Sequence, residues 1–208
     1  QLDDRYKQRA EREKAIGQDA KALEQLLANL RAAAAKAEAD RRAAAKRAAA
    51  EAAAQTKRGK TEHPDHTGKI PPKLVASAPA PKVGGLSWPV SGNLLARFNT
   101  TLPDGHTSKG VLIAAPKGAT VTAVADGTVV FSDWMTGYGM ILIVDHGNGY
   151  MSLYAHNDTL LRDAGASIKR GEAVAKVGSS GGQGVPALYF ELRRNGQPVD
   201  PSSWLQRR

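Results

Sequence analysis

The sequence has no cysteine among its 208 residues, only 5% aromatic residues and no long apolar run. Without cysteine the chain can form no disulfide, no thiolate zinc site and no thiol nucleophile, and its redox compartment stays open. Apolar runs such as Met140–Val144 are far too short to cross a bilayer, so no transmembrane segment is predicted. The first residues lack the apolar core of a signal peptide, and the chain begins with Gln1. We therefore expect a fragment or a mature product, whose own N-terminus says nothing about export.

Acidic residues are too few to balance the basic ones, because 20 Asp and Glu stand against 29 Lys and Arg, a net charge of +9. Such an excess suggests a nucleic-acid or anionic-surface partner. It is unevenly distributed, however: residues 1–58 carry 14 basic and 9 acidic side chains, whereas residues 84–208 carry 11 and 9. Glycine has the opposite distribution, with 18 of 21 after residue 83. The chain therefore joins two segments of different composition, and the basic excess belongs mainly to the first.

Residues 1–58 have no proline and 20 alanines, with mostly Lys, Arg, Glu, Gln and Leu besides, which predicts one long helix. Apolar residues recur at alternating steps of four and three, as in a coiled-coil seam: Ile16, Ala20, Leu23, Leu27, Leu30, Ala34 and Ala37. A one-sided seam needs a partner helix, most simply an upstream half of the same coiled coil. The alternative is a Lys/Ala-rich nucleic-acid arm, but acidic residues are interleaved and no aromatic residue follows Tyr6 in this segment. We predict a coiled-coil helix and no nucleic-acid partner.

Residues 59–83 contain five prolines among Gly, Ser, Thr and Lys, which predicts an extended linker. His63 and His66 could bind a metal weakly. A structural metal site needs about four ligands, so two solvated histidines are the simpler interpretation.

Residues 84–208 alternate short β-branched runs with glycine-containing turns, which is typical of a mainly β domain. The predicted strands cover residues 111–115, 120–124, 128–132, 140–145, 150–154, 173–177 and 188–193. No segment here has helical periodicity. We predict one all-β domain with a core of its own.

Six sequence blocks then occur in order: Gly110–Pro116, Val124–Val130, Asp145–Tyr150, Leu153–His156, Leu188–Leu192 and Asn195–Pro201. Together they resemble the lysostaphin/LytM-type zinc metalloendopeptidases, which cut peptidoglycan cross-links. The resemblance covers residues 86–206 and implies a LytM-like antiparallel β-sheet domain. It says nothing direct about the helix or the linker.

Active members of this family bind zinc through an H-x-x-x-D motif and the second His of an H-x-H motif. The matching positions here are Ser108, Leu112 and Tyr189. The first His of H-x-H, which is catalytic, is replaced by Ala187, and only the other catalytic histidine, His156, is retained. Leucine has no lone pair, a neutral hydroxyl is a poor ligand, and a phenol with a pKa near 10 resists ionisation. Because zinc hydrolysis needs about three protein ligands, the resemblance implies no metal, no cofactor and no catalysis.

Other catalytic interpretations are weaker. His106 lies two positions before the lost first ligand and could swing in, whereas His146 belongs to an Asp-His-Gly turn where a structural hydrogen bond is expected. Ser179 or Ser180 could pair with His156 as a nucleophile, but no acidic orienting residue is visible. The glycine-rich run around these serines lacks the Lys-Ser/Thr of a phosphate loop, and we expect it to be a mobile wall.

The last predicted strand has two faces. Leu188, Phe190 and Leu192 are expected in the core, and Ala187, Tyr189, Glu191 and Arg193 in the former catalytic groove. We predict an exposed protein-binding groove made of Lys109, Leu112, Tyr138, Ile141, His156, Tyr189 and Arg193. Aromatic residues and Arg are enriched in interface cores. The alternative is that these side chains merely fill a dead cavity.

Coiled coil, linker and metal-less domain, in this order and with the run at 178–194, resemble the EnvC-type murein hydrolase activators of Gram-negative bacteria. The resemblance implies a periplasmic protein of the division septum that switches on N-acetylmuramoyl-L-alanine amidases for peptidoglycan splitting and cell separation. It also implies that the coiled coil docks on the FtsE–FtsX complex, and that an N-terminal helix covers the groove until this partner withdraws it. Nothing in residues 1–83 identifies the covering segment. A residual zinc-dependent endopeptidase and a peptidoglycan-binding module remain as alternatives. A biotinyl/lipoyl hammerhead is disfavoured because no Met adjoins a Lys.

Overall fold

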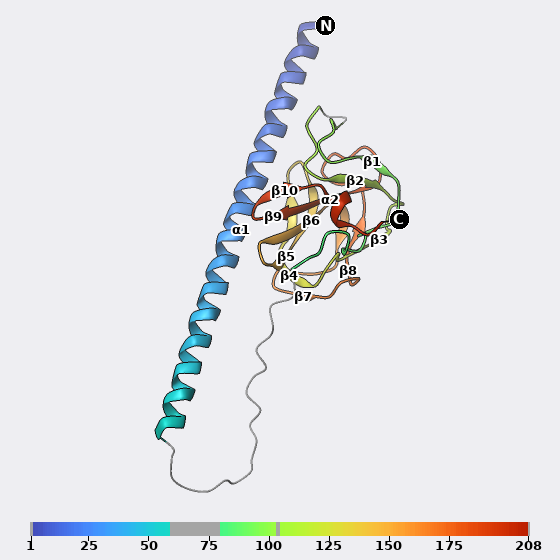
Figure 1. Cartoon of the computed structure of the whole chain (residues 1–208). Helices are drawn as coiled ribbons and strands as arrows, with labels where there is room; N and C mark the ends of the chain where they lie inside the picture. Colours follow the sequence, from blue (N-terminus) through green and yellow to red (C-terminus); the bar gives the residue numbers. More distant parts are fainter. Residues whose placement is uncertain (1, 59–79, 103–104, 208) are drawn as a thin grey trace. The chain divides into compact units, whose positions relative to one another are not determined.

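The computed structural model describes residues 2–58, 80–102 and 105–207. A long helix, α1 (Leu2–Arg58), precedes a β-rich part (Figure 1). The strands of that part are β1 (Leu94–Ala96), β2 (Val111–Ala114), β3 (Thr120–Thr122), β4 (Gly127–Met135), β5 (Gly139–Gly147), β6 (Tyr150–Leu160), β7 (Ser167–Ile168), β8 (Ala173–Val177), β9 (Ala187–Arg194) and β10 (Gln197–Val199). A single helical turn, α2 (Pro201–Trp204), follows.

The predicted fold class, a mainly antiparallel β domain after a long helix, is confirmed. All seven strands expected from the sequence are present, as β2, β3, β4, β5, β6, β8 and β9. Most of the predicted linker, residues 59–79, lies outside the described residues, and so do His63 and His66. The division into segments 1–58, 59–83 and 84–208 stays a prediction. Among the described residues, no helix combines the length and the apolar character that crossing a membrane requires.

The strands form one antiparallel sheet with the order β1-β2-β9-β6-β5-β4-β7. Strand β10 pairs with β9, and β8 pairs with both β6 and β3. The centre of the sheet is therefore β9 between β2 and β6, which are far apart in the sequence. This arrangement places the sequence block 188–192, which lies in β9, directly against the block 110–116, which contains β2.

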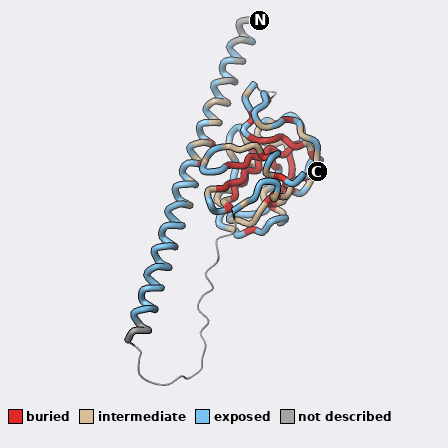
Figure 2. The backbone as a smooth tube through the Cα atoms, viewed as in Figure 1, coloured by how far each residue is buried: buried red, intermediate tan, exposed pale blue. Residues whose placement is uncertain are grey.

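One face of the sheet forms the main hydrophobic core. As expected, Leu188, Phe190 and Leu192 of β9 belong to it, and all three are fully buried. The ring of Tyr154 on β6 packs against Phe190 with centroids 5.3 Å apart. Burial is concentrated in this part of the chain (Figure 2). The alternation of β9 thus fixes which of its side chains are left for the other face.

Helix α1 divides into two parts. Among the described residues, α1 up to Ala28 forms one compact unit with the β-rich part, and the rest of α1 belongs to another. In the second part, most helical side chains up to residue 54 are exposed, and Arg42 pairs with Glu38 one turn away. In the first part, Leu23 and Leu27 of the predicted seam are only 1% and 4% exposed. These two leucines are therefore packed within the β-rich unit.

Candidate functional site

The second face of the sheet is buried as well, although its side chains do not belong to the main core. These side chains are Leu112, Ile141, Ile143, Met151, Leu153, Ala155, Ala187 and Tyr189, all 8% exposed or less. We call them the covered face. They alternate along each strand with the core residues, as the pleat of a β-strand requires. A sheet can bury both faces only if something packs on each.

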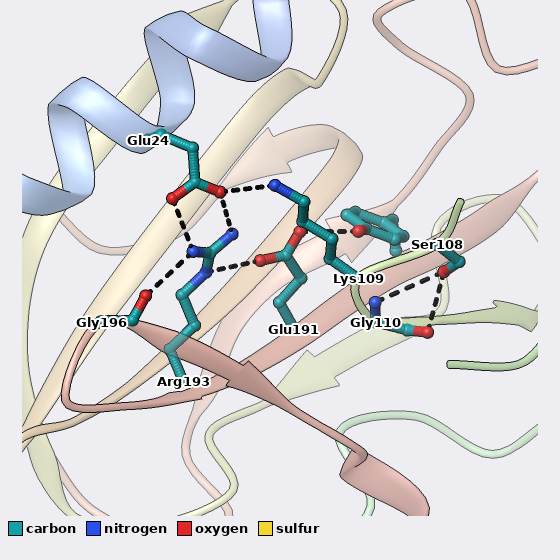
Figure 3. Close-up of polar contacts among 8 residues, drawn as sticks. Glu24, Ser108, Lys109, Gly110, Glu191, Arg193 and Gly196 are labelled. Atoms are coloured by element: carbon teal, nitrogen blue, oxygen red, sulfur yellow. Dashed lines mark hydrogen bonds and ion pairs between the residues drawn. The ribbon is translucent and has the colours of Figure 1, made fainter. Parts of the chain in front are cut away.

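The first part of α1 covers this face. A lone helix cannot bury a leucine almost completely, so Leu23 and Leu27 must contact the sheet side of their own unit. Glu24 lies between them in the sequence and makes ion pairs with two side chains of the β-rich part (Figure 3). Ala20 and Ile16, one and two turns before Leu23 in the seam, are half-buried. The seam is therefore the face that α1 turns toward the sheet.

Glu24 is held by a fork of hydrogen bonds from Arg193. The Nη1 and Nη2 atoms of Arg193 each donate to a different carboxylate oxygen of Glu24, both at 2.9 Å. Lys109 Nζ donates to Glu24 Oε1 at 2.8 Å. Such a two-pronged arginine–carboxylate pair is the most directional of ionic contacts. The helix is thus fixed in rotation and in register at this residue.

Glu191 completes the network beneath the helix. Its Oε2 accepts from Arg193 Nε at 2.8 Å, and its Oε1 accepts from Tyr189 OH at 2.6 Å (Figure 3). The Glu191 side chain is 1% exposed, so its charge depends on these two donors. A buried carboxylate that lost its cation would be costly, by about 3–5 kcal/mol. Arg193 therefore serves the sheet and the helix at once.

The ionisation states follow from these contacts. Burial alone would raise the pKa of Glu24, but hydrogen bonds from Arg193 and Lys109 outweigh it and hold that pKa below the usual range. Burial would also lower the pKa of Arg193, but Glu191 and Glu24 raise it, so the guanidinium stays charged. Burial and then the Glu191 charge raise the pKa of Tyr189 well above its usual value. The cluster is thus two carboxylates, two cations and a neutral phenol.

The three former ligand positions have become part of this packing. Leu112 and Tyr189 are direct cross-strand partners in β2 and β9. Ser108 donates to the carbonyl of Gly110 at 2.9 Å and is 1% exposed. The Tyr189 hydroxyl donates to Glu191 and is not available as an anion. Within residues 2–58, 80–102 and 105–207, no three His, Asp or Glu side chains gather closely enough to hold a metal ion.

The structure brings most of the predicted groove residues together. Tyr138 and His156 each face the Tyr189 ring, with centroids 6.2 and 6.1 Å away. Ile141 is fully buried on the covered face. Burial is the main cause that raises the pKa of Tyr138. Lys109 lies beside Glu24, as described above.

The expected exposure of this groove is wrong. Tyr189 and Arg193 are 7% and 2% exposed, because α1 covers them. Sequence reasoning also missed Leu23, Glu24 and Leu27 as site residues, since it assigned the leucines to a helical partner. The available signal was an acidic residue inside the only leucine-rich stretch of the seam. Its target could not be read from the sequence.

The remaining candidates have structural roles. The ring of His146 is hydrogen-bonded within the fold, because its Nδ1 lies 2.7 Å from the Asp126 carbonyl. This contact confirms the structural hydrogen bond predicted for His146. The hydroxyl of Ser180 donates to the Asn157 carbonyl rather than to a histidine, so the serine–histidine nucleophile is wrong for this residue. His106 lies in the short bridged loop between Thr101 and Thr107.

Comparisons with known proteins found similar sequences and structures. Residues 106–201 match Peptidase family M23. The chain is 42% identical, over 99% of its length, to the murein hydrolase activator EnvC of Escherichia coli K12, of which it covers 51%. It is 38% identical, over 58% of its length, to the murein hydrolase activator NlpD of the same organism, covering 31% of that protein. A solved structure described as a putative peptidase M23 from Pseudomonas aeruginosa is similar with a TM-score of 0.54 and 26% identity, over 77% of this chain and 61% of that one.

The chain spans about half the length, or less, of these curated relatives. Its β-rich part shares the fold of peptidases, and Ser108, Leu112 and Tyr189 stand at the positions that the sequence resemblance matches to zinc ligands. Residues 106–201 therefore match a domain of Peptidase family M23, and the chain is similar over nearly its whole length to a murein hydrolase activator.

Proposed function

We propose that the chain is a non-catalytic activator of N-acetylmuramoyl-L-alanine amidases and binds them through the covered face. The observation that carries the proposal is the occupant of that face: an amphipathic helix with two buried leucines and a carboxylate on Arg193 and Lys109. A surface that binds one such helix can bind another. Two relatives named murein hydrolase activators support the same function.

Hydrolysis by this domain lacks its chemical requirements. A zinc peptidase needs a metal-bound water, and the water needs about three ligands to hold the metal. Leu112 offers no lone pair, and the Tyr189 phenol is kept neutral by burial and by Glu191. We assign recognition, rather than hydrolysis, to the covered face.

The chemistry of the covered face describes the partner segment. The apolar part of this face would bind leucine-like side chains of the partner segment, as it now binds Leu23 and Leu27. Without Glu24, the remaining charges are those of Lys109, Arg193 and Glu191, a net excess of one positive charge. A partner that leaves this excess unpaired would lose the charge-assisted hydrogen bonds. The amidase segment is therefore a helix with an acidic residue flanked by apolar ones.

Regulation follows from the same contact. While α1 occupies the covered face, an amidase cannot bind it, so the chain has a closed and an open state. A partner shifts such an equilibrium only by binding one state more tightly. We assign this role to the FtsE–FtsX complex, acting on the coiled coil at the division septum in the periplasm. Peptidoglycan is the substrate of the activated amidase.

The proposal is tested by mixing purified components. An amidase is assayed on dye-labelled sacculi alone, with the wild-type chain, and with an opened variant, Leu23→Ala/Leu27→Ala. We expect little stimulation by the wild type and strong stimulation by the opened variant. Adding Lys109→Ala and Arg193→Ala to the opened variant should abolish the stimulation. Adding Lys176→Ala instead, on β8 and away from the covered face, should leave the stimulation unchanged.

Three outcomes would contradict the proposal. Amidase activity that is the same with and without the opened variant would exclude activation through this face. Release of dye by the opened variant without amidase, together with stoichiometric zinc in elemental analysis, would favour the endopeptidase instead. Capture of the opened variant on sacculi without amidase, lost with Tyr189→Ala, would favour a peptidoglycan-binding module.

A further inference from the structure

His156, the retained catalytic histidine of the family, lies at an irregular point of β6. Tyr154 pairs with Leu142 and Asn157 with Met140, so two residues of β6 stand opposite one residue of β5. His156 is in this bulge and has a left-handed backbone, with φ of 63°. This conformation is uncommon outside glycine, although Asn, Asp and His adopt it more often than other residues. A strained position of this kind persists only where its surroundings hold it.

Three contacts hold His156. Its backbone N–H donates to the carbonyl of Tyr138 at 2.8 Å. Its ring Nδ1 lies 2.8 Å from the carbonyl of Ser180, and because a carbonyl only accepts, Nδ1 carries the proton and donates. The ring also faces Tyr189. His156 thus links the β4–β5 turn, the loop between β8 and β9, and the covered face.

Ser180 gives the loop a second attachment at the same place. Its hydroxyl accepts from the backbone N–H of Met140 at 3.0 Å and donates to the carbonyl of Asn157. The loop and the β4–β5 turn are so close that a Cβ added to Gly139 would lie 2.2 Å from Ser180 Oγ. Beyond this contact the loop is open, since a Cβ on Gly182 or Gly184 would meet nothing within 4 Å. The expected mobile wall is therefore anchored in its first half.

We propose that His156 is a positioning residue: the hydrogen bond from its Nδ1 to Ser180 clamps residues 179–181 against the β4–β5 turn and so fixes the wall beside Tyr138 and Tyr189. The donor nitrogen of His156 points to a backbone carbonyl, a contact that shapes the loop. The wall would then present a fixed surface to a helix that docks on the covered face.

The chemistry of the clamp suggests a pair of matched variants. The amide nitrogen of asparagine lies at nearly the same place as Nδ1 of histidine, and asparagine tolerates a left-handed backbone. His156→Asn should therefore keep the clamp. In His156→Gln the amide nitrogen lies one carbon farther out, where Nε2 would be, so the hydrogen bond to Ser180 is lost. Both variants are neutral amides, which makes them controls for each other.

The first experiment is hydrogen exchange on the whole chain, followed amide by amide. In His156→Gln we expect the amides of residues 179–183 to exchange about five- to tenfold faster than in the wild type, the effect of losing one buried hydrogen bond. In His156→Asn they should exchange at nearly the wild-type rate. Amides of the core strand β9 serve as the internal standard for global stability. The proposal would be overturned if the loop amides of His156→Gln exchanged at the wild-type rate, or if they exchanged equally fast in His156→Gln and His156→Asn.

The second experiment rests on the proposed function. In the opened variant, His156→Gln should raise the amidase concentration needed for half-maximal stimulation several-fold, leave the maximum unchanged, and be rescued by His156→Asn. If no chain stimulates the amidase but the exchange pattern is as expected, the proposed function fails and the clamp stands. If stimulation occurs and is the same in all three chains, the wall has no part in binding and that role of the clamp is overturned.

Discussion

At the scale of single residues, His146 shows how a buried polar chain fixes a protonation state. Its Nδ1 donates to the Asp126 carbonyl at 2.7 Å, and its Nε2 lies 2.7 Å from Ser152 Oγ. Ser152 Oγ donates at 3.0 Å to the Tyr154 hydroxyl, which also accepts from the backbone N–H of Val124 at 3.1 Å. Burial of the ring favours the neutral imidazole.

This arrangement predicts acid sensitivity in a defined range. Burial is the main cause that lowers the pKa of His146 below the ordinary value of 6.5. The unfolded chain then binds the proton first, so stability is full above about pH 6.5 and falls as the pH drops below it, with a slope of up to about 1.4 kcal/mol per pH unit. Denaturant unfolding between pH 7.5 and 5.5 measures the slope, and His146→Gln should flatten it. An equal slope in both proteins would remove His146 as the cause.

The former ligand positions give a second prediction at this scale. Because Leu112 and Tyr189 are cross-strand partners and Ser108 lies just before β2, the three sites still converge. The triple variant Ser108→His/Leu112→Asp/Tyr189→His, made in the opened background, should bind about one zinc ion per chain, and the opened background itself none. Isothermal titration with zinc and elemental analysis compare them. Equal zinc content in the two proteins would mean that these positions are not the vestigial site.

At the scale of elements, the strands were the predictable part. Glycine turns and β-branched runs mark β2, β3, β4, β5, β6, β8 and β9 in the sequence, whereas β1, β7 and β10 have three residues or fewer and leave no period to detect. Strand β3 is equally short, but it lies within the longer predicted run at residues 120–124. The alternation along β9 also predicted its two faces correctly. The seam of α1 was recognisable too. The surface against which this seam packs could not be predicted, because a row of leucines indicates only that an apolar surface lies opposite.

The docking of α1 can be measured directly. Leu23→Ala removes a side chain that is almost completely buried, and such truncations cost about 2–5 kcal/mol. We expect faster hydrogen exchange at α1 residues 16–28, with the backbone amides of the sheet strands unchanged. Lys21→Ala, an exposed position between the same turns, is the matched control and should leave exchange as it is. Loss of protection throughout the β-rich part would instead mean that the helix is part of its core.

At the scale of the whole molecule, the net positive charge that first suggests a nucleic-acid partner lies mostly outside the candidate site. Most of the +9 lies outside the β-rich part, and the site uses two cations, Lys109 and Arg193. The position of these two in the fold follows from pairing β2 with β9, which the sequence does not state. The resemblance to the metallopeptidases indicated through matching motifs that these segments meet. The resemblance to the activators implied a covering helix, and the structure identifies that helix as the first part of α1.

The second apolar face also has a consequence for the lifetime of the open form. When α1 leaves, Leu112, Ile141, Ile143, Met151 and Leu153 lose their cover together. A contiguous apolar sheet surface of this kind promotes self-association. Helix α1 therefore protects an aggregation-prone apolar surface until the partner protein binds in its place. Release without this partner nearby would end in aggregation, so opening and capture have to be coupled in time.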